Sequence, residues 1–384
     1  MTSSKHVPDL RALVPDNLSR RQALKLGGAS AVSLWITACG GGGSKPAAAT
    51  ATNGKLEKQL LIANWVDYTS PAAYKAFTQT VGPKISLDGY GSNEELLTKL
   101  SAGGAAYDIV VPSNGAMKVM IEKSQALKLN HALLPNLKNL QPKFRSLPYD
   151  PGNRYSVAKN FGVTSFYWRS AVVKTPPTTI KEGFDVLRSL PSDARVNFVD
   201  SASDVAVIVL LALGYDVNSE NQSQYDEASR LLKSVKPKIQ TFSSEYIPRG
   251  SAGEIDFGLG WNADIARIIA ARAKKGDEVV MLLPDTTPTA FWVDNWAIPA
   301  TAKNPIAAHR WINYMLDPKI AAKEAAYVRA PYPIRGIDRY APKDIVGNPD
   351  IYIDPAKIAR YKVDNPTPRV VQLQQQLYTD FKAV

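Results

Sequence analysis

The chain has 384 residues, of which 45% are hydrophobic and 21% are charged, and its formal net charge is +11. These values are ordinary for a soluble globular protein that is long enough for two domains. Cys39 is the single cysteine, which excludes an internal disulfide bond. The lysines and arginines are scattered rather than clustered, so the basic charge does not indicate a nucleic-acid partner.

The first 38 residues have the pattern of an export signal. Arg20 and Arg21 precede a mildly apolar run, residues 26–38, that is too short and too rich in glycine and serine to span a membrane permanently. The paired arginines resemble a twin-arginine signal, and the Ile-Thr-Ala-Cys sequence ending at Cys39 resembles the lipobox of bacterial lipoproteins. We therefore expect a periplasmic or other extracytoplasmic protein with a lipid anchor on Cys39, exported by either the twin-arginine or the general route.

Residues 39–58 are rich in glycine, alanine and threonine, which predicts a flexible tether. Its glycines do not indicate a phosphate-binding loop, because no strand precedes them and no Lys-Ser or Lys-Thr pair follows. The folded part of the chain is therefore expected to begin near Gln59.

From Gln59 onward, short apolar runs alternate with helical segments, which is typical of a parallel sheet with crossover helices. The expected strands are 59–65, 84–90, 108–112, 195–200, 238–242, 255–261 and 279–284, and the expected helices are 71–80, 92–102, 202–213, 225–235, 262–275, 305–316, 318–328 and 370–382. Residues 161–173 cross into a second unit of the same kind, and residues 291–299 cross back. This pattern predicts an α/β protein of two lobes with a cleft between them. We expect residues 59–160 with 297–335 in the first lobe, and residues 161–296 with 336–384 in the second.

The second crossing, Phe291 to Pro299, carries one carboxylate and two tryptophans in an apolar strand. An unpaired buried carboxylate is strongly disfavoured, so Asp294 is expected either to have a cationic partner or to open into the cleft. Trp292 lies two residues earlier and would point to the same side of the strand, whereas Trp296 is expected to pack in the interior. A ring face beside an anion is suited to binding an organic ammonium group.

Further aromatic and polar residues follow the predicted strands. Ligands of α/β sheets bind beyond the carboxyl ends of strands, so these residues are expected to face the cleft. The candidates are Trp65, Asp67, Tyr68 and Ser113 in the first lobe and Ser201, Asp204 and Trp261 in the second. Alternatives remain open: Ser201 as a helix cap, Asp204 as a charge favoured by the helix dipole, and Trp261 as a core residue. Asp264 is expected to be a first-turn charge and nothing more.

The sequence offers little catalytic machinery. Beyond the signal, the histidines are His131 and His309, and no HExxH, G-x-S-x-G, P-loop or strand-linked G-x-G-x-x-G motif is present. We expect no metal, no cofactor and no enzymatic activity, since an enzyme would have to work with carboxylates alone.

Five motifs in order, NWVDY, SNEELLTKL, YDIVVPS, GLGWNAD and FWVDNWAIP, resemble the spermidine/putrescine-binding proteins of bacterial ABC importers. The resemblance runs from about residue 59 to the end of the chain. It implies a two-lobed, type II-like periplasmic-binding fold with crossing hinge strands that closes on a linear polycation. It also implies a permease and an ATPase as partners and favours a monomer.

The resemblance assigns roles to individual residues. Trp65, Asp67 and Tyr68 would contact the ligand, and Ser113 would hydrogen-bond it. Asp204 stands where the family has a glutamate, and Trp261 and Trp292 would lie on either side of the ligand's methylene chain. Asp294 would be the carboxylate that binds a nitrogen of the ligand. The chain departs from the family in having Ser201 for an aspartate and Gly115 and Ala330 for tyrosines, and a polar contact is expected around Asp364.

The sequence therefore predicts an extracytoplasmic receptor that captures a polyamine with carboxylates and aromatic rings. Two alternatives remain: a binding protein for another amine-containing solute, such as an amino acid or an opine, and an exported carboxylate-dependent hydrolase.

Overall fold

The computed structural model describes residues 54–102, 106–283, 290–349, 351–352, 362–363 and 365–383. The chain divides into two compact units, Met1–Lys45 and Pro46–Val384, and all the described residues belong to the second. The export signal, Cys39, residues 39–53 of the tether and Asp364 lie outside the described residues. None of the helices in the described ranges has the length and hydropathy needed to cross a membrane.

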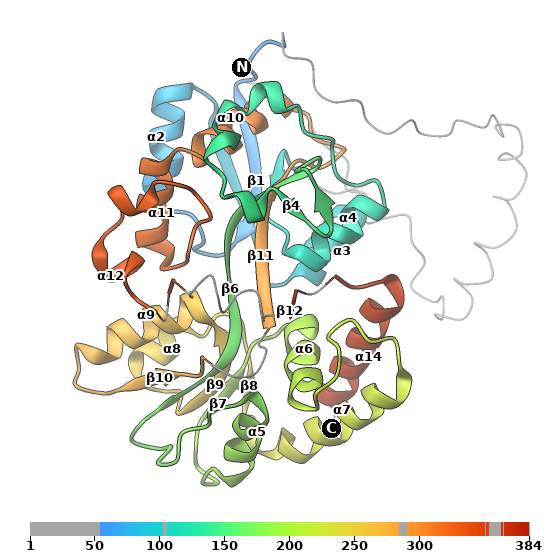
Figure 1. Cartoon of the computed structure of the whole chain (residues 1–384), viewed down its shortest axis with the longest axis vertical. Coiled ribbons are helices and arrows are strands. Elements are labelled where there is room, and N and C mark those ends of the chain that lie inside the picture. Colours follow the sequence, from blue (N-terminus) through green and yellow to red (C-terminus); the bar gives the residue numbers. More distant parts are fainter. Residues whose placement is uncertain are drawn as a thin grey trace, which may run out of the picture. The chain divides into compact units, whose positions relative to one another are not determined.

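The described strands form one large mixed sheet and one small hairpin (Figure 1). The large sheet has the order β2 (Lys84–Tyr90), β1 (Gln59–Trp65), β3 (Ile109–Val110), β11 (Ala290–Ala297), β6 (Ser156–Arg169), β9 (Phe257–Trp261), β7 (Val196–Phe198) and β8 (Thr241–Phe242). In addition, β10 (Val279–Met281) pairs with β6, and β12 (Lys362–Val363) pairs with β11, while β4 (Ser146–Leu147) and β5 (Asp150–Pro151) form the hairpin. The pairs β1–β2, β1–β3, β7–β8 and β7–β9 are parallel, as the alternating pattern predicted.

Helices surround both ends of this sheet (Figure 1). Around β1–β3 lie α2 (Pro71–Val81), α3 (Asn93–Ser101), α4 (Asn114–Glu122), α10 (Pro305–Met315), α11 (Pro318–Val328), α12 (Lys343–Val346) and the 3₁₀ turns η2 (His131–Leu133), η3 (Pro135–Asn139), η4 (Pro142–Phe144) and η6 (Ile337–Arg339). Around β7–β9 lie α5 (Ile180–Ser189), α6 (Ala202–Ala212), α7 (Gln222–Val235), η5 (Lys236–Lys238), α8 (Ile247–Ala252), α9 (Asn262–Ala273) and α14 (Pro368–Ala383).

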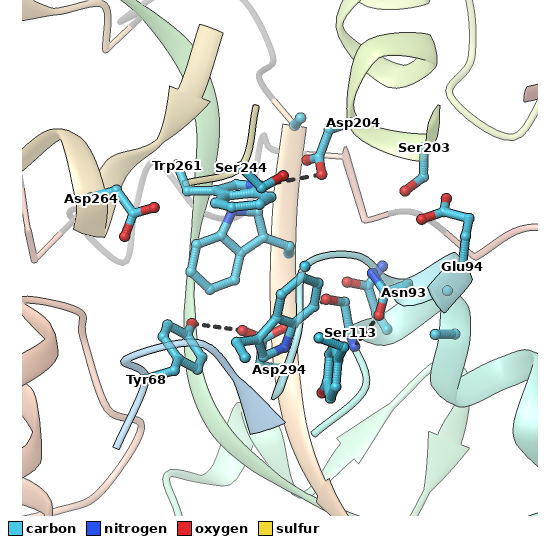
Figure 2. A pocket seen from close by; sticks show the side chains of 18 of the residues that line it. Tyr68, Asn93, Glu94, Ser113, Ser203, Asp204, Ser244, Trp261, Asp264 and Asp294 are labelled. Atoms are coloured by element: carbon cyan, nitrogen blue, oxygen red, sulfur yellow. Dashed lines mark hydrogen bonds between the residues drawn. The ribbon is translucent and has the colours of Figure 1, made fainter. Parts of the chain in front are cut away.

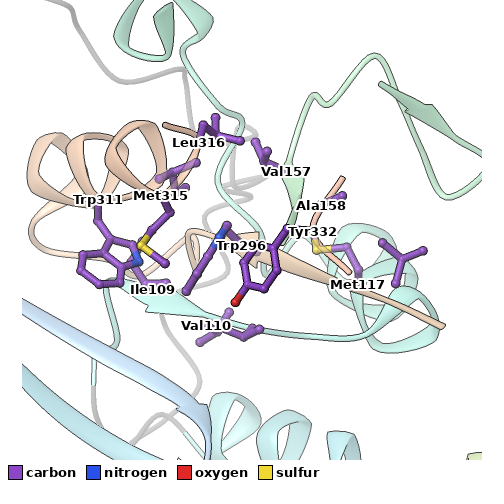
Figure 3. Packing of buried hydrophobic residues seen from close by; sticks show 14 of the residues in the cluster. Ile109, Val110, Met117, Val157, Ala158, Trp296, Trp311, Met315, Leu316 and Tyr332 are labelled. Carbon is purple, nitrogen blue, oxygen red and sulfur yellow. The ribbon is translucent and has the colours of Figure 1, made fainter. Parts of the chain in front are cut away.

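Two separate hydrophobic cores define the two lobes. The first surrounds β1, β3 and β11 and includes Trp296, Trp311 and Tyr332, with the two indole centroids 5.8 Å apart (Figure 3). The second surrounds β7, β9 and α6. The long antiparallel strands β6 and β11 pair along eight residues of β11 and connect the two cores. The α/β two-lobed architecture and the crossing strands are therefore confirmed.

Two helices that follow strands of the first lobe begin at serine caps that the sequence carries. The Ser70 hydroxyl accepts the Ala73 N–H at 3.0 Å, so α2 begins at Pro71. The Ser92 hydroxyl accepts the Glu95 N–H at 3.1 Å, and α3 begins at Asn93.

Several boundaries differ from the expected ones. Ile337, Ile345 and Ile351 pack in the first core, although residues 336–384 were expected in the second lobe. β3 begins at Ile109, one residue after the expected start, and the Asp108 carboxylate accepts the backbone N–H groups of Leu61 and Asn304, each at 2.8 Å.

The first crossing also differs from the prediction. The strand β6 begins at Ser156, five residues before the expected start of the crossing at residue 161. Asn262 does not cap α9; Trp261 occupies that position, and Asn262 Oδ1 instead accepts the Val163 N–H of β6 at 3.0 Å. This amide therefore fixes the start of α9 against the crossing strand, beside the cavity described below.

Candidate functional site

A cavity of about 460 Å³ lies where the ends of β1 and β3 meet the starts of α6 and α9, with β11 as its floor (Figure 2). Its wall combines residues from both lobes. Eight of the nine predicted ligand-binding residues line it: Trp65, Asp67, Tyr68, Ser113, Asp204, Trp261, Trp292 and Asp294. Ser201 does not, because it is buried as the N-cap of α6, where its hydroxyl accepts the Asp204 N–H.

Asp294 is the most deeply buried carboxylate of the cavity, with 4% of its surface exposed. The Tyr68 hydroxyl donates to one of its oxygens and the Ser113 hydroxyl to the other, each at 2.6 Å. Burial raises the pKa of Asp294 to about 6, although these hydrogen bonds and the charge of Lys159 act to lower it. The two hydroxyls therefore hold the carboxylate in place and leave its remaining lone pairs for a donor in the cavity.

Lys159 provides a cation behind this carboxylate. Lys159 is buried, with 1% of its surface exposed. Its ammonium nitrogen lies 3.7 Å from the centre of the Tyr68 ring and donates to the Tyr68 carbonyl at 2.9 Å. Burial lowers the pKa of Lys159 to about 7, while the charges of Asp294 and Glu324 raise it. Both expectations for Asp294 are thus met in part, since it faces the cavity and has a cation nearby.

Indole rings form the walls of the cavity. The rings of Trp65 and Trp261 meet edge to face with centroids 5.8 Å apart, and Trp65 Nε1 donates to the Val111 carbonyl at 2.8 Å. The Trp292 ring lies against β6 at Gly162, where an added Cβ would come within 2.3 Å of the ring. Because the same Cβ would also come within 2.1 Å of Asn262 Oδ1, only glycine at this position leaves room for both side chains.

Asp204 lies in the first turn of α6 and accepts three side-chain hydrogen bonds. The donors are the hydroxyl of Thr164, the hydroxyl of Ser201 at 2.7 Å and Trp261 Nε1 at 3.2 Å. Burial raises the pKa of Asp204 in spite of these bonds. Ser201 therefore acts on the site through Asp204, which it holds in position.

Asp67 has a different environment from the other carboxylates. It is exposed and adopts a left-handed backbone conformation with φ of 57°. Its carboxylate forms an ion pair with Arg267 of α9 at 2.5 Å and accepts a hydrogen bond from the Tyr327 hydroxyl. Burial acts to raise the pKa of Asp67, but these hydrogen bonds outweigh it and lower the pKa. Because Asp67 follows β1 and Arg267 belongs to α9, this ion pair joins the two lobes at the rim of the cavity.

The cavity also contains carboxylates that the sequence analysis did not select. Asp264 lines it, and burial raises its pKa to about 7, with the charge of Arg267 acting in the opposite direction. Glu94, at the start of α3, lines it as well. Both lie in the first turn of a helix, where a carboxylate is usually explained by the helix dipole, so the local pattern gave no reason to choose them.

His309 has a structural role. His309 is fully buried, its Nδ1 lies 2.6 Å from the Pro305 carbonyl, and its Nε2 accepts the Asn130 N–H at 3.0 Å. Within the described ranges, no group of three histidine, cysteine or acidic side chains is placed to hold a metal ion.

A protein-family profile described as "Bacterial extracellular solute-binding protein" matches residues 72–335. The chain belongs to this family. This solute-binding protein is 31% identical over 362 residues to spermidine/putrescine-binding periplasmic protein 1 of Haemophilus influenzae, with 92% of this chain and 97% of the relative covered. It is 30% identical over 344 residues to a putrescine-binding periplasmic protein of Escherichia coli, covering 85% of this chain and 92% of the relative.

A solved structure supports the same assignment. The spermidine/putrescine ABC transporter substrate-binding protein of Streptococcus pneumoniae matches with a TM-score of 0.70 at 25% identity, over 85% of this chain and 99% of that chain. The two-lobed periplasmic-binding fold expected of this solute-binding protein is therefore confirmed.

The two positions where a tyrosine was expected differ in their surroundings. Gly115, in α4, lines the cavity without a side chain, whereas Ala330 is fully buried in a small cluster with Ala263 and Val328 and does not line it. Tyr90 lies in the wall near Trp65, with ring centroids 4.9 Å apart, and contributes an aromatic surface that the sequence analysis missed.

Proposed function

We propose that this solute-binding protein captures a linear polyamine of the putrescine or spermidine type outside the cytoplasmic membrane and delivers it to the permease and ATPase of an ABC importer. The observation that carries the proposal is the position of Asp294, a buried carboxylate held by two hydroxyls on the floor of a cavity walled by tryptophans. The relatives named above, which bind putrescine or spermidine, support the same ligand class.

The chemistry of the wall agrees with such a ligand. Acidic residues lining the cavity are Asp67, Glu94, Asp204, Glu245, Asp264 and Asp294, and Arg267 is the basic residue among its described lining. Since Arg267 is paired with Asp67, the other carboxylates have no basic partner among the described lining residues, and a cationic ligand would supply one. The indole faces would contact the methylene chain and attract the ammonium groups through cation–π interaction.

Further aspects of the proposal rest on the sequence. We propose that a lipid on Cys39 anchors the protein to the membrane, that the protein acts as a monomer and that it has no catalytic activity of its own. The family consists of solute-binding proteins, which supports the last point.

Isothermal titration calorimetry tests the proposal. The full chain with Cys39→Ser, which removes the lipidation site, would be titrated with 1,4-diaminobutane, spermidine, amino acids and sugars. We expect micromolar or tighter binding of at least one polyamine and no heat from sugars. Tight binding of an amino acid with no binding of amines would instead show that the cavity serves another amine-containing solute.

A further inference from the structure

The wall of the cavity contains polar atoms that the described part of the protein does not satisfy. Glu94 Oε2, Ser244 Oγ and Gln374 Nε2 are buried and have no hydrogen-bond partner among the described residues. All three residues line the cavity. Buried polar atoms in folded proteins nearly always have a partner, and the unpartnered carboxylate oxygen of Glu94 is an acceptor that a cationic ligand in the cavity can satisfy.

Gln374 brings a second polar side chain to the cavity wall. It lies in α14, is 2% exposed and lines the cavity, so its side chain is held inside the protein rather than in solvent. Tyr378, one helical turn later on the same face, experiences the negative charge of Glu94. Because Glu94 of α3 and Gln374 of α14 line the same cavity, the first lobe contributes α3 and the second lobe contributes α14 to its wall.

Glu94 also faces a second carboxylate. Burial and the charge of Asp204 raise the pKa of Glu94, while hydrogen bonds with its own backbone, the backbone of Ser203 and the side chain of Ser92 lower it. Glu245 adds a further negative charge to the wall, and the single basic residue in the described lining, Arg267, is engaged by Asp67. Two neighbouring carboxylates repel each other, and a cation between them offsets that repulsion.

The carboxylates of the cavity are spread along its length. Figure 2 shows Asp264 on one side and Glu94 on the other, with Trp261 and Asp294 between them. Three separate acidic positions result: Asp264, Asp294, and the pair of Glu94 with Asp204. A short diamine has two ammonium groups for these three positions, whereas a linear triamine has three.

We propose that Glu94 and Gln374, beside Asp204, form a distal subsite for a terminal ammonium group, and that this subsite makes the protein prefer linear triamines over short diamines. The inference rests on the proposed polyamine-binding function and adds to it the residues that select ligand length. The carboxylate of Glu94 accepts hydrogen bonds from the ammonium group. The unpartnered atom of Gln374 is the donor Nε2, so the side-chain amide has to turn over for its oxygen to accept from the same group.

The test compares Glu94→Gln with the full-length Cys39→Ser chain by calorimetric titration of spermidine and 1,4-diaminobutane. We expect the variant to bind spermidine at least tenfold more weakly and to bind the diamine within twofold of the parent. Gln374→Leu should weaken spermidine binding by a smaller factor, with the same sparing of the diamine. Glu95→Gln is the matched control, because Glu95 is the next residue of α3, is exposed and does not line the cavity, so both affinities should stay unchanged.

Equal weakening of both amines by Glu94→Gln, or no weakening of spermidine, would overturn the subsite while leaving the polyamine function intact. Failure of the parent chain to bind either amine would overturn the polyamine function itself. A second measurement uses the parent chain alone, so that it does not depend on the folding of a variant. 1,8-Diaminooctane should bind more tightly than 1,4-diaminobutane if a terminal ammonium reaches Glu94, and equal or weaker binding of the longer diamine would also overturn the subsite.

Discussion

Replacing Asp294 by asparagine removes the charge from the floor of the cavity and changes little else. The side chains have the same size, and the Tyr68 and Ser113 hydroxyls that now donate at 2.6 Å still have one oxygen to meet. The amide NH₂ faces the other hydroxyl, which has to rotate and accept. A hydrogen bond to a charged group contributes about 1.5–3 kcal/mol, so the loss of the carboxylate should weaken binding of an ammonium ligand by about 10- to 150-fold.

The fold should tolerate Asp294→Asn, because a neutral amide is easier to bury than a carboxylate whose pKa is already raised to about 6 by burial. We expect the free energy of unfolding to change by about 1 kcal/mol in either direction, measured by urea unfolding. Titration calorimetry with 1,4-diaminobutane and spermidine measures the affinity. Asp185→Asn is the control, since Asp185 is exposed, pairs with Arg188 at 2.8 Å and lies outside the cavity.

Unchanged affinity in Asp294→Asn would refute the reasoning, because it would mean that no ammonium group meets this carboxylate. A similar loss of affinity in Asp185→Asn would also refute it, since the effect would then be a general consequence of lost negative charge.

The remaining predictions concern pH, the ion pair between the lobes and the indole wall. Because burial raises the pKa of Asp294 to about 6 and that of Asp264 to about 7, both carboxyls become protonated as the pH falls from 8 to 5.5. The affinity for amines should therefore decrease over this range, and calorimetric titrations that give a constant affinity would contradict the prediction. Arg267→Gln removes the 2.5 Å ion pair with Asp67, which joins the two lobes, and should weaken the binding of all amines by a similar factor of less than ten. If calorimetry shows an effect that depends on the length of the amine, the ion pair does not act by holding the lobes closed. Trp292→Ala should weaken diamines and triamines by similar factors, because it removes a wall common to both, and an effect on one class alone in the same titrations would disprove that.

The site residues that follow strands in the first lobe could be predicted from the sequence, because their strands are strongly marked. Residues 59–65 form β1 as expected, and the polar residues after it enter the cavity. The capping serines Ser70 and Ser92 fix where the next helices begin. The strand pattern and the helix caps, both visible in short stretches of sequence, are therefore sufficient to predict this edge of the sheet.

Other parts of the site depend on contacts between distant residues. The carboxylate of Asp67 is bound by Arg267 and Tyr327, which are 200 and 260 residues away along the chain, so no local pattern could show that its charge is compensated. Gln374 reaches the cavity only because α14 packs in the second core. In both cases the packing of whole elements, rather than the nearby sequence, determines what the side chain meets.

The net charge of +11 also illustrates why composition does not identify the ligand. The described cavity wall has six acidic side chains and one basic side chain, and that basic residue is paired with Asp67. Salt screens charges beyond about 8 Å, so scattered surface lysines contribute little to the potential inside a partly closed cavity. Burial is the main cause of the raised pKa values of Glu94, Asp204, Asp264 and Asp294, and the charge of a neighbouring carboxylate adds to it in Glu94, Asp264 and Asp294. A bound polycation would remove the mutual repulsion of these carboxylates, which makes a basic protein an effective receptor for a positively charged solute.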